Sequence, residues 1–157
     1  MRTTRLVRTT FIIALAAAPA TAGAVLAAPV GKVTGTYGYT SISGPKAVSL
    51  DAHAGVPVRG TWQFTNLASG DELAGPVSCL RIDGEDAWLA GPPTTGEAGV
   101  FIYVHDGGRG GGDDQAITWI QDPGQPFEEL QGWCESGATH VERSELDFGN
   151  LTIHAGS

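Results

Sequence analysis

Hydrophobic and polar residues alternate with a period of two along much of the chain. The clearest alternation spans residues 58–65, where Val58, Trp62 and Phe64 share one parity and polar side chains take most of the other. A period of two places successive side chains on opposite faces of a β-strand, so this strand is predicted to have one core face and one solvent face. Residues 48–53 repeat the pattern and predict a second strand of the same kind.

A stretch over residues 77–107 organises the rest of the chain, because it predicts three consecutive strands joined by two turns. Asp83 and Gly84 are predicted to form the first turn, since a two-residue hairpin turn needs positive φ angles that Asp and Gly tolerate. The run VFIYV over residues 100–104 is apolar on both faces, which predicts a central strand. Other predicted strands span residues 32–42, 116–120 and 149–155.

Two segments lack a strand pattern. Residues 107–114, GGRGGGDD, contain too much glycine for regular structure and are predicted to form an exposed loop. Residues 122–131 predict an irregular excursion with one helical turn over residues 126–130. Nothing after the N-terminal segment has an amphipathic helical period longer than about two turns.

These patterns predict an all-β fold. About eight short strands at roughly even spacing, most of them linked by tight turns, indicate an antiparallel meander. Such a meander can close as a small barrel or fold over as a two-sheet sandwich. We favour the small barrel, because closure removes the sheet edges that a sandwich leaves exposed.

The N-terminus has the pattern of a secretory signal peptide. Three arginines within the first eight residues precede a short apolar run over residues 11–18, and small residues follow. Cleavage after Ala24 makes residues 1–24 the signal peptide and residues 25–157 a single secreted, extracellular β-domain. No stop-transfer pattern follows, so no membrane insertion is expected after cleavage. The alternative is an uncleaved N-terminal anchor.

The mature chain is strongly acidic. Removal of the three N-terminal arginines leaves 6 Lys+Arg against 17 Asp+Glu, a formal net charge of −11. Such a surface repels nucleic acid and anionic membranes, so neither is an expected partner. The acidity is compatible with cation binding or a cationic partner, and also with a simple contribution to solubility.

The chain has two cysteines, Cys79 and Cys134. An even number of cysteines in a secreted chain predicts one disulfide, closing a loop of about 54 residues and stabilising the fold by about 3–4 kcal/mol. The alternative is two separately buried thiols.

The glycine-rich loop carries the acidic residues most able to bind a cation. Asp106, Asp113 and Asp114, with His105 beside them, offer carboxylate oxygens of the kind that Ca²⁺ prefers. The string resembles a calcium-binding nonapeptide repeat, but Gly112 occupies the position that needs Asp, and the repeat occurs once instead of in an array. A solvated hairpin loop without calcium, and no resident cofactor, is the favoured interpretation.

Catalytic motifs are absent from the sequence. The four histidines show neither HxH nor HExxH spacing, and no G-x-S-x-G nucleophile elbow is present. Glu128 with Glu129, and Glu142 with Glu145, are paired carboxylates, but both pairs lie in polar segments where their acidity should be ordinary. No catalytic residue is predicted.

Aromatic residues give the best candidates for ligand contacts. Tyr103, Trp119 and Trp88 lie on predicted strands, and such rings can stack on sugars or line an apolar pocket. Their alternative role is to fill the core, which is the favoured role for Trp62 and Phe64.

Several motifs together resemble a known group of proteins. The run VSCLRIDGEDAWLAG, then VFIYVHDGG, DDQ and a closing GNLTIH, is similar to a pattern V-x-C-L-x-V-D-G-N followed by F-x-V-x-D-N-G and P-D-Q. This pattern belongs to small secreted bacterial all-β proteins with no established activity. Glu85 and Gly107 replace the usual asparagines, whereas Asp83, Gly84 and Gln115 match. The resemblance implies secretion and β architecture and transfers no catalytic residue.

The sequence therefore predicts a secreted, extracellular β-domain without a recognisable catalytic site, that binds a ligand or partner or has a structural role; a non-enzymatic role is favoured. The expected partner is a small apolar molecule, a glycan or a protein. One alternative is a barrel enzyme of the isomerase or cyclase type with an apolar pocket. A second is a calcium-stabilised adhesion module.

Overall fold

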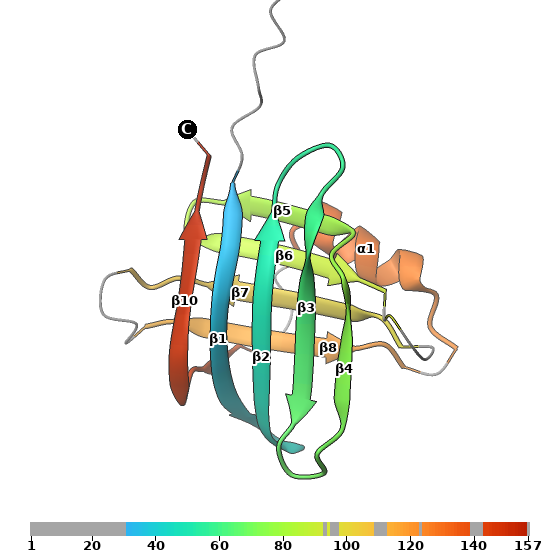
Figure 1. The fold of residues 1–157 in the computed structure, drawn as a ribbon, viewed down its shortest axis with the longest axis vertical. Helices are drawn as coiled ribbons and strands as arrows, with labels where there is room; N and C mark the ends of the chain where they lie inside the picture. Colours follow the sequence, from blue (N-terminus) through green and yellow to red (C-terminus); the bar gives the residue numbers. More distant parts are fainter. Residues whose placement is uncertain are drawn as a thin grey trace, which may run out of the picture.

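The first of two antiparallel sheets contains five strands in the order β10-β1-β2-β3-β4 (Figure 1). The computed structural model describes residues 31–92, 94, 98–108, 113–122, 124–138 and 143–156. The strands of this first sheet are β1 (Lys32–Ser41), β2 (Gly44–His53), β3 (Arg59–Asn66), β4 (Glu72–Pro76) and β10 (Phe148–His154).

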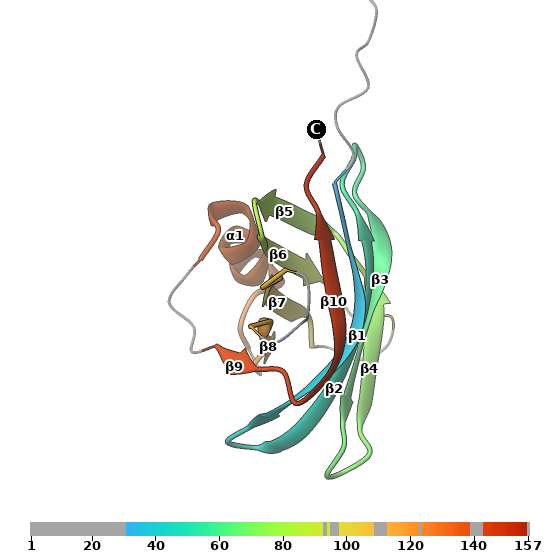
Figure 2. The same cartoon turned by 90° about the vertical axis from the view of Figure 1, so that its left-hand side faces the viewer.

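The second sheet also contains five strands, in the order β5-β6-β7-β8-β9, and it runs across the first (Figure 1). Helix α1 (Phe127–Ser136) covers the face of this sheet that points away from the first sheet (Figure 2). The strands are β5 (Cys79–Asp83), β6 (Asp86–Gly91), β7 (Val100–His105), β8 (Gln115–Ile120) and β9 (Ser144–Glu145).

The described strands form no closed barrel, so the favoured small barrel is corrected to two separate sheets, which fit the sandwich alternative. The change of sheet occurs between two successive residues. Val77 N donates a hydrogen bond to Gly60 O of β3, at 3.0 Å, whereas Ser78 N donates to Ala90 O of β6, at 2.9 Å. Because the chain leaves the first sheet here, β4 and β5 do not pair and no continuous ladder closes.

The main core lies between the two sheets and follows the alternation in the sequence. Val48 and Leu50 of β2 lie beside Phe64 and Trp62 of β3 in the strand register, and all four side chains are buried. The indole of Trp62 also donates a hydrogen bond to Pro76 O, at 3.2 Å. The predicted core face of these strands is therefore confirmed.

Strand β7 is the central strand of the second sheet, as its apolar pattern predicts. Val100, Ile102 and Val104 face the core between the sheets. Phe101 and Tyr103 belong to a second core, on the side covered by α1. The two-faced apolar run thus reflects a sheet that is buried on both sides.

Helix α1 is longer than the single turn predicted over residues 126–130. Leu130 and Cys134 lie four residues apart, so both point to the same side of the helix, and both are buried. Gly137 ends the helix in the left-handed region, with a φ of 69°. The helix therefore depends mainly on packing against the second sheet.

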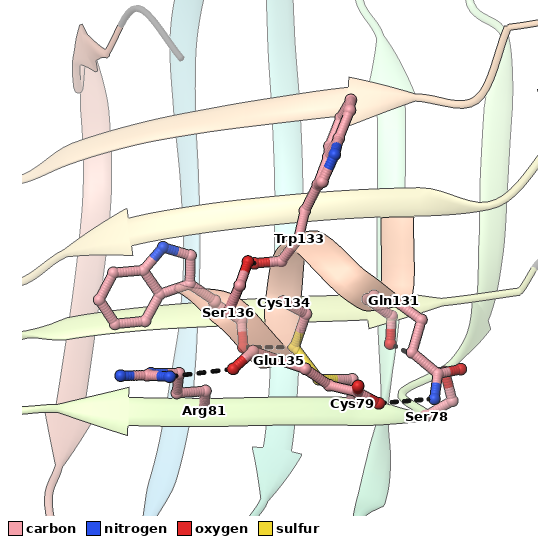
Figure 3. The surroundings of a disulfide bond; sticks show 10 residues. Ser78, Cys79, Arg81, Gln131, Trp133, Cys134, Glu135 and Ser136 are labelled. Carbon is pink, nitrogen blue, oxygen red and sulfur yellow. Dashed lines mark hydrogen bonds between the residues drawn. A yellow bond between two sulfur atoms is a disulfide. The ribbon is translucent and has the colours of Figure 1, made fainter. Parts of the chain in front are cut away.

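The disulfide predicted from the cysteine count joins this helix to the sheet (Figure 3). Cys79 of β5 and Cys134 of α1 have their Sγ atoms 2.02 Å apart. Nearby, Arg81 Nη1 donates a hydrogen bond to Glu135 O at 2.9 Å. Covalent and polar contacts therefore hold α1 against β5.

The predicted signal peptide, residues 1–24, lies outside the described residues. Within the part of the chain that the structure describes, no helix has the length and apolar character needed to cross a membrane.

Candidate ligand-binding cleft

A cleft of about 790 Å³ opens between the sheets at one end of the molecule. At this end the β1–β2 and β3–β4 turns extend beyond β8, as both ribbon views show (Figures 1 and 2). Phe64 and Leu73 line the cleft from the first sheet, and Ile120 lines it from the second, whereas Ile117, also at the cleft, is on the opposite face of β8 and packs against the second core. The cleft walls are therefore largely apolar.

Lys46 introduces a positive charge into this apolar space. It shares the inward parity of Val48 and Leu50 on β2, so its side chain continues the core face towards the open end. In the register, Lys46 lies between Tyr39 of β1 and Asn66 of β3, and all three residues line the cleft. Lys46 is only 5% exposed.

The ammonium group of Lys46 has neutral partners. Its Nζ donates a hydrogen bond to Ser43 O at 3.0 Å and lies 6.0 Å from the centre of the Phe64 ring. Among the described residues, no carboxylate lies within ion-pair distance of Lys46. A buried charge without a counter-ion is costly, which makes this group chemically distinctive.

A hydrogen bond joins the two sheets beside the cleft. Thr118 N of β8 donates to Tyr39 Oη of β1, at 3.1 Å, and both residues line the cleft. Burial raises the pKa of Tyr39 above the ordinary value, so its hydroxyl stays protonated to a higher pH than that of an exposed tyrosine. This bond fixes the spacing of the cleft walls.

The acidic residues of the cleft are at its rim. Asp71 and Asp122 are both exposed, and Asp71 Oδ2 accepts a hydrogen bond from Ser69 Oγ at 2.6 Å. The exposed side chain of Ile42 lies at the same opening. Water screens the rim charges more strongly than the buried charge of Lys46.

The structure places the three predicted ligand-contact residues in two different locations. Trp119 lines the cleft, is 37% exposed, and makes an edge contact with Trp133, with ring centres 6.0 Å apart. Trp88 and Tyr103 instead belong to the second core, where their ring centres are 5.5 Å apart. The structure therefore brings only Trp119 of the three to the cleft.

Tyr103 belongs to a polar cluster beside that second core. Its hydroxyl donates to Asp86 Oδ1 at 2.5 Å, and His105 Nδ1 lies 3.0 Å from the same oxygen. The guanidinium carbon of Arg143 lies 4.5 Å from the centre of the Tyr103 ring. Burial, followed by the contact with Asp86, raises the pKa of Tyr103. These contacts satisfy the hydroxyl internally.

The carboxylates predicted for calcium bind the backbone instead. The two oxygens of Asp106 accept hydrogen bonds from Gly108 N at 2.9 Å and Ile153 N at 2.8 Å. Asp114 is buried and accepts one from Gly107 N at 2.9 Å, while Asp113 is exposed. Residues 109–112 of this loop lie outside the described ranges. In those ranges, no group of three or more His, Cys, Asp or Glu residues is arranged to hold a metal ion.

Sequence reasoning missed Lys46, although the alternation contains a signal for it. The inward parity of Val48, Leu50 and Ala52 extends to Lys46 without a break. A lysine at the end of a row of core-facing residues can be located in two ways. The strand end can extend beyond the core into solvent, or the charged side chain can lie in a cavity. The distinction depends on β8, which is more than sixty residues away in the sequence, so local pattern does not resolve it.

Comparisons of the chain with protein-family models, with curated proteins and with solved structures find no match.

Proposed function

We propose that this protein is a secreted binding protein that holds a small apolar molecule in the cleft between its two sheets. The observation that carries the proposal is the apolar cleft itself. Its volume of about 790 Å³ lies within the range of about 300–1,000 Å³ found for small-molecule sites. Phe64 and Leu73 on one wall and Ile120 on the other offer apolar contacts to both sides of such a ligand.

The chemistry of the cleft supports binding better than catalysis. An isomerase or cyclase needs acid and base groups in contact with an enclosed substrate. The two carboxylates of the cleft, Asp71 and Asp122, are exposed at its rim. A calcium-stabilised adhesion role has less support, because Asp106 and Asp114 already accept backbone hydrogen bonds.

A neutral fluorescent probe tests the proposal. Phenylnaphthylamine, which brightens in apolar surroundings, should bind the protein, and decanol should displace it. Leu73→Ser removes an apolar wall of the cleft, and we expect it to weaken probe binding by about five- to tenfold, since burial of a leucine-sized group contributes about 1.5–3 kcal/mol when complete.

Ala74→Ser is the matched control, because Ala74 is the next residue on β4 and is exposed instead of lining the cleft. It should leave probe binding unchanged. Absence of probe binding to the wild-type protein, or equal loss in the two variants, would contradict the proposal.

Secretion is tested separately. We expect the protein isolated from the culture medium to begin near Val25, after removal of residues 1–24. N-terminal sequencing or intact mass gives this end directly. A chain that stays in the cell fraction with its first 24 residues attached would support the anchor alternative.

A further inference from the structure

We propose that the cleft selects amphiphiles with one anionic head group, which binds Lys46 Nζ while the apolar body lies between the sheets. The head group is a carboxylate, sulfonate or phosphate, since all three present oxygen acceptors with negative charge. This inference rests on the proposed function and adds the chemical class of the ligand.

The Lys46 ammonium makes fewer hydrogen bonds than it can donate. An ammonium carries three N–H donors, and the described structure gives this one a single hydrogen bond, to Ser43 O at 3.0 Å. Lys46 is 5% exposed, so water compensates its charge poorly. An anion in the cleft would supply both the missing acceptors and the missing counter-charge.

The charge of Lys46 lies close to the apolar walls of the cleft. Lys46 lies next to the inward-facing row that contains Phe64 and Leu73, which are paired across β3 and β4. Its Nζ is 6.0 Å from the Phe64 ring centre. A ligand whose anion contacts Nζ therefore has apolar side chains within reach of its body. A neutral apolar ligand would leave the ammonium uncompensated.

The acidic residues of the cleft do not compete for Lys46. Asp71 and Asp122 line the same cleft but are exposed, and Ser69 Oγ already donates to Asp71 Oδ2. Neither lies within ion-pair distance of Lys46 among the described contacts. The buried cation therefore remains available to a ligand despite the acidic surface.

Two probes that differ by one sulfonate group test the inference. Anilinonaphthalene sulfonate is the anionic counterpart of phenylnaphthylamine, so the ratio of their affinities isolates the head group. The wild-type protein should bind the sulfonate about tenfold more tightly or better, as expected for a charge-assisted hydrogen bond in a buried site.

Lys46→Met keeps an unbranched side chain, one atom shorter than that of lysine, and removes its charge. We expect the sulfonate preference to fall to about one, because the variant loses affinity for the sulfonate and not for the neutral probe. Lys32→Met is the matched control, because Lys32 is the other lysine of the chain and lies at the opposite end of β1, outside the cleft. It should keep the full preference.

Competition then separates the head groups. Decanoate and decyl phosphate should each displace the bound sulfonate at lower concentration than decanol, and their order identifies the preferred anion. Equal displacement by decanoate, decyl phosphate and decanol would overturn the inference.

The outcomes separate the two proposals. If neither probe binds, the proposed function fails. If both bind with equal affinity, or Lys46→Met keeps the sulfonate preference, the binding function stands and the role of Lys46 is wrong. If Lys46→Met does not fold, the ammonium signals of the two lysines in nitrogen-labelled wild-type protein replace it: decanoate should shift one of them, and no shift overturns the inference.

Discussion

Tyr39 Oη accepts a hydrogen bond from Thr118 N at 3.1 Å, and this bond links the two sheets beside the cleft. The neighbouring Tyr37 is also buried, but its hydroxyl makes no hydrogen bond with the described residues. Both tyrosines are on β1, and their ring centres are 6.4 Å apart. One hydroxyl thus has a structural role that the other lacks.

This difference predicts opposite effects for two matched substitutions. Tyr39→Phe leaves the Thr118 N–H without its acceptor, so we expect the free energy of unfolding to fall by about 1–3 kcal/mol. Tyr37→Phe removes an unsatisfied buried hydroxyl and should be neutral or slightly stabilising. Urea denaturation of the two variants measures both values. Equal destabilisation would show that the Tyr39 bond contributes nothing specific.

The ionisation of tyrosine should coincide with unfolding. The chain has three tyrosines, and burial is the largest cause of the raised pKa of each of them, Tyr37, Tyr39 and Tyr103. In the unfolded chain these groups titrate near the ordinary value of about 10. Above that pH the folded state binds more protons than the unfolded state, so stability falls as pH rises.

Phenolate absorbance followed together with circular dichroism checks this prediction. Below about pH 10 the stabilising contribution should be fully present, and above it phenolate should form only as ordered structure is lost. Reversible ionisation of one tyrosine near pH 10 in the folded protein would contradict the burial of that hydroxyl.

Removal of the disulfide should lower stability without changing the fold. Replacing Cys79 and Cys134 together by serine should reduce the free energy of unfolding by about 3–4 kcal/mol, because the unfolded chain regains the freedom of a long loop. Guanidinium denaturation measures the loss. Wild-type protein that has been reduced and alkylated is the comparison, and stability equal to the untreated protein would contradict the prediction.

Chelation of divalent metal should leave the melting temperature unchanged. Both oxygens of Asp106 and one of Asp114 accept backbone hydrogen bonds. A metal bound only by the folded state would raise the melting temperature as its concentration rises. A thermal scan with calcium and with chelator makes the test, and a higher melting temperature in calcium would support the calcium-binding loop.

Asp106→Ala provides a separate test of the backbone role. We expect it to destabilise the protein by about 1–3 kcal/mol, because the amides of Gly108 and Ile153 lose their acceptor. Asp113→Ala is the control, since Asp113 is exposed. It should have little effect on the urea midpoint.

The strands with alternating sequences could be predicted because their pattern is local. Trp62 and Phe64 bury one face of β3, and residues 100–104 form the central β7, as the period and the apolar run indicate. Strand β4 was missed because its sequence ELAGP has little alternation and contains glycine and proline. Its place depends on pairing with β3, which the local sequence does not encode.

The candidate site was harder to predict than the strands. Tyr103 and Trp119 lie on neighbouring strands of the second sheet, yet only Trp119 lines the cleft. The outcome depends on the packing of α1 onto the central β7, which buries Tyr103, and on the position of β8 at the open end of the sheets, which leaves Trp119, on the same face, at the cleft. Both are long-range relationships. Residue type and spacing alone therefore indicated that aromatic side chains could contact a ligand, but not which of them lie at the cleft.

Because β10 pairs with β1, the first sheet is completed only when the C-terminal end of the chain has been synthesised. Gly35 lies opposite Leu151, so one edge of the first sheet is built from segments roughly a hundred residues or more apart. Because synthesis starts at the N-terminus, Val33 and Tyr37 of β1 are made long before β10, and the first sheet stays incomplete until the C-terminal segment emerges. Contacts this distant slow folding, towards the millisecond-to-second range. A partly made chain therefore presents an open β1 edge to its neighbours, and holding nascent chains apart should improve their yield.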